Sequence, residues 1–503
     1  MNIIIKNIHI LCITFLSFSF TLKPMIVRPE LPEKKFLVDQ SQYSHLEGEA
    51  IYRTHIFEWL TGMPEEKFVD YYNTKGKLPK LPSSTQKLID GLRPETYTLS
   101  TLRSAAQDKL THNNGKLSIL YLDVMKHPEK RHLIDIGALQ AKHSGAVFQT
   151  ASRPSGLEGK QMVYKANKEA TESEHAFDYI HNGFATIIGS SAVQGEEAAI
   201  SCAIKAIYQI YMIDKNINLF AKLGIKTNPR GKITKINSEL LNQSDVDNLS
   251  DNICVRFWDN VPVTTGPSNV LFQSQTIAKA AKANKPFNSN VRTKNRDDAN
   301  MLVTEPCFIS QVNVSAVDLS RDKKTECIKG FGKEYALAEK TAQAALKAAY
   351  EATIYAAIKD QKTKVFLTLV GCGAFQNKLE WVADILGNMT GIIKNSGLDI
   401  TLVAMDADGH LSEKQKDAWE KIKNITTKTN GTIIDAAQPE KSITANLAPN
   451  GTSNPTNSEI NPQLRGILPS SLHQKILLGI GGGLSLIGLL FVLKHYYQNT
   501  TPK

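Results

Sequence analysis

The sequence predicts an α/β fold whose central strands are buried on both faces. Strand-like and helix-like segments alternate between Leu117 and Ala407. One strand candidate, Val365–Val370, is an almost unbroken apolar run, which is typical of a strand covered on both sides. Because crossover connections place helices on both faces of such a sheet, we expect three layers, α/β/α, around a mixed sheet.

Each element of this fold follows from local pattern. Runs rich in β-branched and aromatic residues predict strands at 117–125, 145–152, 309–319, 365–370 and 398–405. Apolar residues spaced three or four apart predict helices at 195–212, 333–358 and 378–394. The second of these helices is rich in alanine and carries Leu346, Tyr350 and Ile354 at a spacing of four.

The N-terminal end differs from this body. Lys6 precedes the apolar run Ile10–Leu22, and Lys23-Pro24 closes it. A basic region followed by an apolar segment of this length predicts a signal peptide or an N-terminal anchor over residues 1–24. Residues 25–110 have scattered prolines and short helical patterns, so we expect a mixed, mainly helical region to which no chemistry can be assigned.

The C-terminal end predicts a single membrane span. Residues 476–493 carry no charge, lie between Lys475 and Lys494, and would reach ~27 Å as a helix. Gly479 and Gly483 form one G-x-x-x-G spacing, which predicts a weak homodimer within the membrane.

The segments beside this span set its orientation. The tail, 494–503, carries two lysines, so the positive-inside rule predicts a cytoplasmic tail and an extracytoplasmic body. Residues 436–474 are rich in Asn, Pro, Ser and Thr and read as a flexible stalk between the body and the span.

Composition excludes several classes of function. The net charge is +10, but the lysines are spread along the chain, so we expect them to lie on the solvated surface. Outside the leader, the cysteines are odd in number and irregularly spaced, so neither a metal site nor a disulfide framework is expected. The basic stretch 278–296 offers only Phe287 for stacking, which makes nucleic acid an unexpected partner. No phosphate-binding lysine motif of the nucleoside triphosphatases is present.

Two glycine-containing loops are candidate phosphate sites. After the strand 365–370, Gly371 and Gly373 permit positive φ and let backbone N–H groups approach an anion. The alternative is a tight strand exit that needs no ligand. A second loop, 189–201, combines two glycines with small hydroxyl residues and leads into a helix.

Two carboxylates open that second helix. Glu196 and Glu197 stand in its first turn, where acidic side chains are favoured by the helix dipole. That stabilising role is one interpretation. The other makes one of them a ribose ligand or a catalytic acid/base.

Taken in order, these segments resemble a macro domain, the ADP-ribose-binding α/β module. The matching stretches are "HLIDIGALQ", "VFQTAS", a glycine-containing helix start, a long alanine-rich helix, "KVFLTLVGCGAFQNKLEWVADIL" and "LDITLVAMD". In that family an Asp-Ile pair meets the adenine, as Asp135-Ile136 would here. A G-x-G-x-[FY] loop holds phosphate, as Gly371, Gly373 and Phe375 would. The resemblance implies a domain over 111–435 with an insertion at about 215–300.

The chain also departs from this family. Where N-A-A-N is common, it has Gln149-Thr150-Ala151-Ser152. The stretch 184–200 resembles the poly(ADP-ribose) glycohydrolase signature, but Ser190-Ser191 replace two glycines and Gly195 separates Gln194 from the glutamates. The resemblance therefore implies a cleft whose chemistry differs from that of the family.

Together these observations predict a membrane-anchored macro-like module that binds ADP-ribose, a related nucleotide conjugate or an ADP-ribosylated protein. The candidate ligand-binding residues are Asp135, Ile136, Gln149, Ser152, Gln194, Gly195, Gly371, Cys372, Gly373, Ala374 and Phe375. An ADP-ribosyl hydrolase using Glu196 or Glu197 is the alternative, and an interaction protein with a degenerate ligand site is the third. No cofactor and no metal ion are expected.

Overall fold

The computed structural model describes residues 50–110, 114–123, 126–152, 184, 193–212, 220, 225–227, 233–236, 246–268, 299–319, 335–373, 375–406, 413–439 and 443–444. All of them fall within one compact unit, Met1–Leu447.

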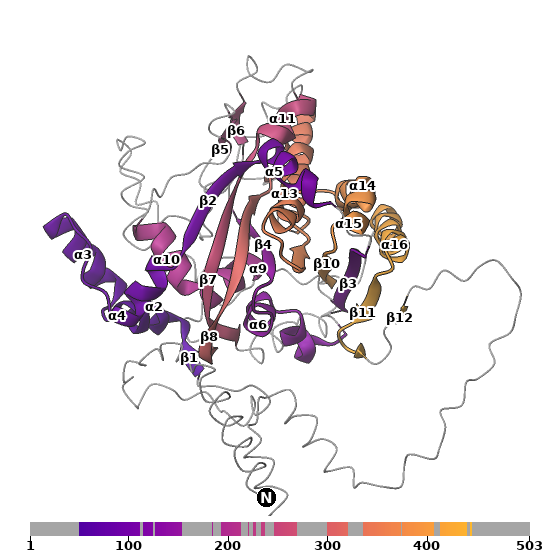
Figure 1. Ribbon diagram of the computed structural model, residues 1–503. Helices are drawn as coiled ribbons and strands as arrows, with labels where there is room; N and C mark the ends of the chain where they lie inside the picture. The colour runs from indigo at the N-terminus through magenta and orange to yellow at the C-terminus, as the bar shows by residue number, and fades with distance from the viewer. Residues whose placement is uncertain are drawn as a thin grey trace, which may run out of the picture. The chain divides into compact units, whose positions relative to one another are not determined.

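A mixed sheet organises this unit (Figure 1). Its strands follow the order β12 (Ile443–Thr444), β11 (Thr432–Asp435), β3 (Lys116–Asp123), β10 (Asp399–Asp406), β9 (Lys364–Thr368), β4 (Val147–Ser152), β8 (Ala299–Ser315), β7 (Cys254–Ser268) and β2 (Arg93–Thr98). From β11 to β8 each strand is parallel to its neighbours. The flanking strands, with β1 (Ala50–Tyr52) on β8, are antiparallel. A separate hairpin joins β5 (Ile225–Thr227) and β6 (Ile233–Ile236).

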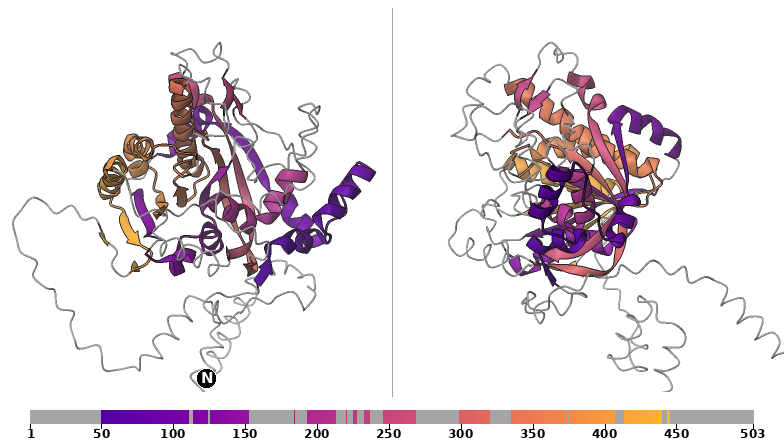
Figure 2. Two further views of the ribbon diagram at one scale, coloured as in Figure 1. Left: turned by 180° about the vertical axis from the view of Figure 1, so that it is seen from behind. Right: turned by 90° about the vertical axis from the view of Figure 1, so that its left-hand side faces the viewer.

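One face of the sheet is covered by α13 (Tyr335–Lys359), which packs on β4, β7, β8 and β9. Its alanines allow a close approach, and Leu346, Tyr350 and Ile354 are all buried. The other helices of this face are α5 (Leu99–Ala106), α11 (Val246–Asn252), α14 (Leu379–Asn388), α15 (Thr390–Asn395) and α16 (Glu413–Lys428). We call this the α13 face. The left view of Figure 2 shows the molecule from behind.

The opposite face is covered by α6 (Ile136–Lys142) and α9 (Val193–Ser201). Phe148 of β4 and Phe366 of β9 stack in its core, with ring centroids 4.6 Å apart. We call this the α9 face. A short 3-10 helix, Pro128–Leu133, leads from β3 into α6, and another, Gln107–Lys109, follows α5.

The N-terminal helices form a further apolar cluster. It joins α2 (Arg53–Thr61), α3 (Glu65–Lys75) and α4 (Ser83–Asp90) to α10 (Ala203–Tyr211). Phe57 packs against Phe68 and Tyr211, with centroids 5.3 and 5.8 Å apart. Since β1 and β2 also pair with the main sheet, the described part of the predicted 25–110 region is built into the body.

The prediction of a mixed α/β fold around a central sheet is confirmed, with local corrections. The expected helix 195–212 is two helices, because the backbone leaves helical geometry at Cys202. The expected helix 378–394 likewise divides at Met389. The range 215–300, expected as an insertion, supplies β7, an integral strand of the sheet.

Several predictions concern residues outside the described ranges. These are the leader 1–24, residues 440–442 and 445–474 of the stalk 436–474, the span 476–493 with Gly479 and Gly483, and the tail 494–503. Ile443 and Thr444, within the range predicted as a flexible stalk, instead form β12 and pair with β11. Within the described residues, no helix has the length and apolar character required to cross a bilayer.

Candidate functional site

Asp135 and Ile136 lie at the start of α6, after the 3-10 helix Pro128–Leu133 that follows β3. Asp135 caps that helix: its Oδ1 accepts a hydrogen bond from the backbone N–H of Ala138 at 2.9 Å. Both residues are buried. In parallel sheets, ligands bind beyond the carboxyl ends of the strands, and the Asp-Ile pair follows such an end.

The loop after β9 reaches the same edge of the sheet. Gly371 has φ of +74°, and a Cβ there would stand 2.7 Å from Ala316 Cβ and 2.9 Å from Asn377 Cγ. Packing alone therefore requires this glycine. At Gly373, which is exposed, a Cβ would meet no described atom within 4 Å, so the loop is filled at one glycine and open at the other.

Hydrogen bonds tie this loop to the chain that follows β8. Asn377 Nδ2 donates to the Val317 carbonyl at 2.8 Å, and the backbone N–H of Leu319 donates to the Phe375 carbonyl at 3.0 Å. Burial, with a smaller contribution from the charge of Glu380, raises the pKa of the Cys372 thiol to about 12. Cys372 is therefore an uncharged thiol at neutral pH. Ala374 lies outside the described residues.

Gln149 lies on the α13 face. Its Nε2 donates to the Ala349 carbonyl at 3.1 Å, and its Oε1 accepts from the Thr368 N–H at 3.0 Å. The side chain thus links β4, α13 and β9. This arrangement assigns Gln149 to the core and directs it away from α6 and α9.

Ser152 lies on the α9 face, because side chains alternate along β4. Its Oγ donates to the Val314 carbonyl at 3.2 Å. Toward the carboxyl ends of β4 and β8, and on the adjoining part of β7, the α9 face changes from apolar to polar. The buried residues of this polar band are Thr150, Ser152, Gln311, Asn313, Ser315 and Arg256.

Helix α9 begins at Val193, so only Glu196 of the two predicted glutamates stands in its first turn. Gln194 is partly exposed, Gly195 is buried, and the preceding loop residues 189–192 lie outside the described ranges. Glu196 pairs with Arg53 of α2 at 2.5 Å, and both side chains are almost fully buried. Arg53 Nε also donates to Asn300 Oδ1 at 2.9 Å. Glu196 is therefore directed toward the N-terminal helices.

Glu197 occupies a different side of α9. Residues four apart share one side of a helix, which places Glu197 above Ser201. Ser201 bonds to Gln140 of α6, and a Cβ at Gly137 would lie 3.4 Å from Ser201 Cβ. Glu197 is buried on the side that faces α6, the helix that Asp135 caps.

Sequence reasoning missed one residue of this face. Lys205 of α10 is 5% exposed, although the sequence predicts that the lysines lie on the solvated surface. Its Nζ donates to Asn313 Oδ1 at 2.9 Å and lies 5.1 Å from the centroid of the Trp258 ring. Desolvation is the main cause that lowers the pKa of Lys205 to about 7, and the charge of Arg256 adds to it. The apolar stripe of its helix was the only signal in the sequence.

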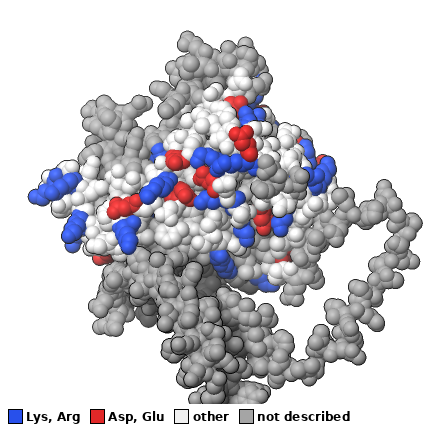
Figure 3. Space-filling view, in the orientation of Figure 1, with Lys and Arg blue, Asp and Glu red and all other residues white. Residues whose placement is uncertain are grey.

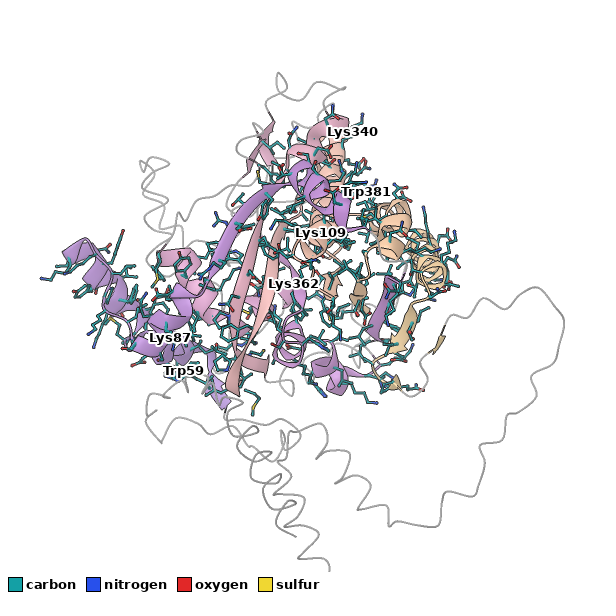
Figure 4. All side chains as sticks on the ribbon, in the orientation of Figure 1. Trp59, Lys87, Lys109, Lys340, Lys362 and Trp381 are labelled. Carbon is teal, nitrogen blue, oxygen red and sulfur yellow. The ribbon has the colours of Figure 1, made fainter. Side chains whose placement is uncertain are left out.

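Charges on the molecular surface are mixed. On the side shown in Figure 3, basic and acidic side chains alternate. Lys362, labelled in Figure 4, pairs with Asp259 at 2.9 Å, and Lys359 pairs with Glu95 and Asp360 at 3.6 and 2.8 Å. In the part of the chain described, no group of His, Cys, Asp and Glu side chains is arranged to hold a metal ion.

No protein-family model and no curated protein matches the chain. Among solved structures, poly(ADP-ribose) glycohydrolase from Deinococcus radiodurans in complex with ADP-ribose is 10% identical, with a TM-score of 0.36 over 69% of this chain and 100% of that chain. The enzyme from Thermomonospora curvata, bound to the inhibitor ADP-HPD, is 11% identical, with a TM-score of 0.32 over 73% and 98%. Similarity at this level supports no argument about function, which must rest on the geometry of this chain.

Proposed function

We propose that the chain binds ADP-ribose or a related nucleotide conjugate at the carboxyl edge of its parallel strands. One observation carries the proposal: β3 and β9 end at the same edge of one sheet, and the chain continues from β3 through a 3-10 helix to Asp135-Ile136 and from β9 into the loop Gly371–Phe375. Adenine would pack near Asp135-Ile136, and the pyrophosphate would lie beside the open side of the loop at Gly373. The resemblance of these motifs to those of macro domains supports this choice of ligand.

The test is a calorimetric titration of the full-length chain, in detergent, with ADP-ribose. Because a side chain at Gly373 would meet no described atom, Gly373→Leu places bulk on the open side of the loop without disturbing the core. We expect it to lower affinity at least tenfold. Gly391→Leu, at an exposed position on α15 where a Cβ also meets no described atom, is the matched control. Absence of heat and of any thermal shift at millimolar ADP-ribose would contradict the proposal.

The second candidate is hydrolysis of an ADP-ribosyl linkage. Glu197 is the candidate acid/base, because helix spacing places it on the side of α9 where Ser201 bonds to Gln140 of α6. Release of ADP-ribose from a modified protein should then be abolished by Glu197→Gln. Turnover that survives both Glu197→Gln and Glu196→Gln would exclude this mechanism.

We further propose that residues 476–493 anchor the protein in a membrane with its body extracytoplasmic. The uncharged run between two lysines supports this. Retention in carbonate-washed membranes, lost on deletion of 476–503, is the expected result, and protease accessibility of the body reports its side. Release of the intact chain by carbonate would exclude the anchor.

A further inference from the structure

A buried lysine without an anionic partner among the described residues is the starting point. Lys205 is 5% exposed, and its Nζ contacts the neutral amide of Asn313 and the ring of Trp258. No ion pair of the described residues includes it. A buried ammonium is costly unless a negative group compensates it, so this position has an unmet electrostatic requirement.

A second cation lies beside it. Arg256 of β7 is 8% exposed, and its Cζ lies 5.7 Å from the centroid of the same Trp258 ring. In the sheet Arg256 is the register partner of Asn313, the residue that holds Lys205. Two positive charges therefore gather over one indole ring, and the charge of Arg256 acts to lower the pKa of Lys205.

Unpaired polar groups accompany these cations. Ser315 follows Asn313 by two residues on β8 and so projects from the same face. Its Oγ is buried and has no hydrogen-bond partner among the described residues. The same holds for Trp258 Nε1, in a side chain that is fully buried. Each can donate a hydrogen bond, so the Lys205 ammonium and these donors together call for an acceptor that carries negative charge.

We propose that Lys205, Arg256 and Ser315 form a binding site for a tetrahedral oxyanion of the phosphate or sulfate type. Such an anion compensates Lys205, is attracted by the neighbouring Arg256 and accepts from the serine hydroxyl, whereas a neutral ligand leaves the charge of Lys205 unmet. The site does not depend on the proposed nucleotide binding. Its oxyanion is either a free ion or a phosphoryl group of the nucleotide.

The test uses sulfate and the full-length chain in detergent, titrated at pH 6.5 in an oxyanion-free buffer with chloride keeping the ionic strength constant. Lys205→Met should lower the sulfate affinity at least tenfold while the ligand-free protein keeps or gains thermal stability, because an uncompensated charge is removed. Lys428→Met, at an exposed position on α16, should change neither. A Lys205→Met protein that melts earlier and binds sulfate as before would overturn the proposal.

A second variant guards against misfolding. Because the Ser315 hydroxyl makes no hydrogen bond to the described residues, Ser315→Ala should fold normally and bind sulfate several-fold more weakly. Unchanged sulfate affinity in a folded Ser315→Ala protein counts against the site.

Binding should also take up a proton. The groups that act on Lys205 are Arg256, which stays charged, and Cys202, whose pKa burial raises to about 12. Lys205 is therefore the group that titrates, while sulfate keeps its charge. Above pH 7 the sulfate affinity should fall about tenfold per pH unit. A flat profile between pH 6 and 9 would contradict the assignment.

Competition identifies the source of the oxyanion. If saturating ADP-ribose displaces the bound sulfate, the site binds a phosphoryl group of the nucleotide. Sulfate that stays bound assigns it to a separate ion. Because the sulfate titration needs no nucleotide, the site is tested even where ADP-ribose fails to bind.

Discussion

The two faces of the central sheet treat polar groups in opposite ways. On the α13 face, Gln149 and Tyr350 are buried and their hydrogen bonds are made within the core. On the α9 face, the charged pair Arg53–Glu196 and the cations Lys205 and Arg256 are buried. Some strand side chains of the α9 face also have a buried polar atom with no hydrogen-bond partner among the described residues. These are Trp258, Ser315 and Thr368. The α13 face therefore satisfies these buried neutral groups within the core, whereas the α9 face buries charges, which are costlier to leave uncompensated and can attract a charged ligand.

The largest expected effect comes from Arg53. Arg53→Met leaves the Glu196 carboxylate buried without the Arg53 cation and should lower the free energy of unfolding by about 3–5 kcal/mol. The double variant Arg53→Met/Glu196→Met removes both charges and should recover most of that loss. Urea denaturation of the three proteins measures it. A double variant no more stable than the single one would show that packing, and not charge, dominates this contact.

On the α13 face a neutral change should cost less. Gln149→Leu leaves the Thr368 N–H and the Ala349 carbonyl without the amide that joins them and should lower the free energy of unfolding by about 2–3 kcal/mol. Gln86→Leu, at an exposed position on α4, should stay within about 0.5 kcal/mol of the parent chain. A larger loss for Gln149→Leu than for Arg53→Met would reverse the contrast between the faces.

The pH dependence of stability provides a graded test of Lys205. Folding lowers its pKa from 10.5 to about 7, so between these values the unfolded chain binds more protons than the folded one. In the absence of oxyanions, the free energy of unfolding should therefore rise with pH by up to about 1.4 kcal/mol per unit. The measurement is the difference between the parent chain and Lys205→Met at pH 6.5, 7.5, 8.5 and 9.5. A constant difference would mean that Lys205 does not titrate in the folded state.

The smallest effect belongs to Tyr350. Its hydroxyl donates to the Thr368 carbonyl at 2.7 Å and accepts from the Val370 N–H at 3.3 Å. Tyr350→Phe keeps the ring and should lower the free energy of unfolding by about 1 kcal/mol. Sulfate affinity should not change, because the hydroxyl serves the α13 face alone. Thermal denaturation and the sulfate titration together separate these two outcomes.

The sequence predicts those parts of the fold whose pattern is local. The strands β3, β4, β9 and β10 and the alanine-rich helix α13 lie close to their expected ranges, because each has its own apolar run or periodicity. Strand β7 was not predicted, because it contains Pro262 and Gly266, which are unfavourable in strands. Its strand conformation depends on long-range pairing with β8. The first half of β8 was not predicted either, because it too depends on long-range pairing with β7.

The candidate site divides along similar lines. The positive φ that a glycine permits is found at Gly371, yet what fills the space there is Ala316, a neighbour distant in sequence. Likewise the apolar stripe of its helix does not indicate what surrounds Lys205, because Asn313 and Trp258 reach it from other parts of the chain. Glu196 and Glu197 are adjacent, and only the helix geometry separates their directions.

The Arg53–Glu196 pair has a practical consequence for anyone who shortens this chain. Arg53 opens α2, directly after β1, and its partner lies 143 residues further on. A fragment designed to begin at the strand after residue 110 would expose the apolar side of α10 and leave the Glu196 carboxylate without Arg53. The smallest fragment that folds on its own should therefore start before Ala50. Strand β1 and helix α2 belong to this minimal folding unit, although they precede the predicted macro-like domain.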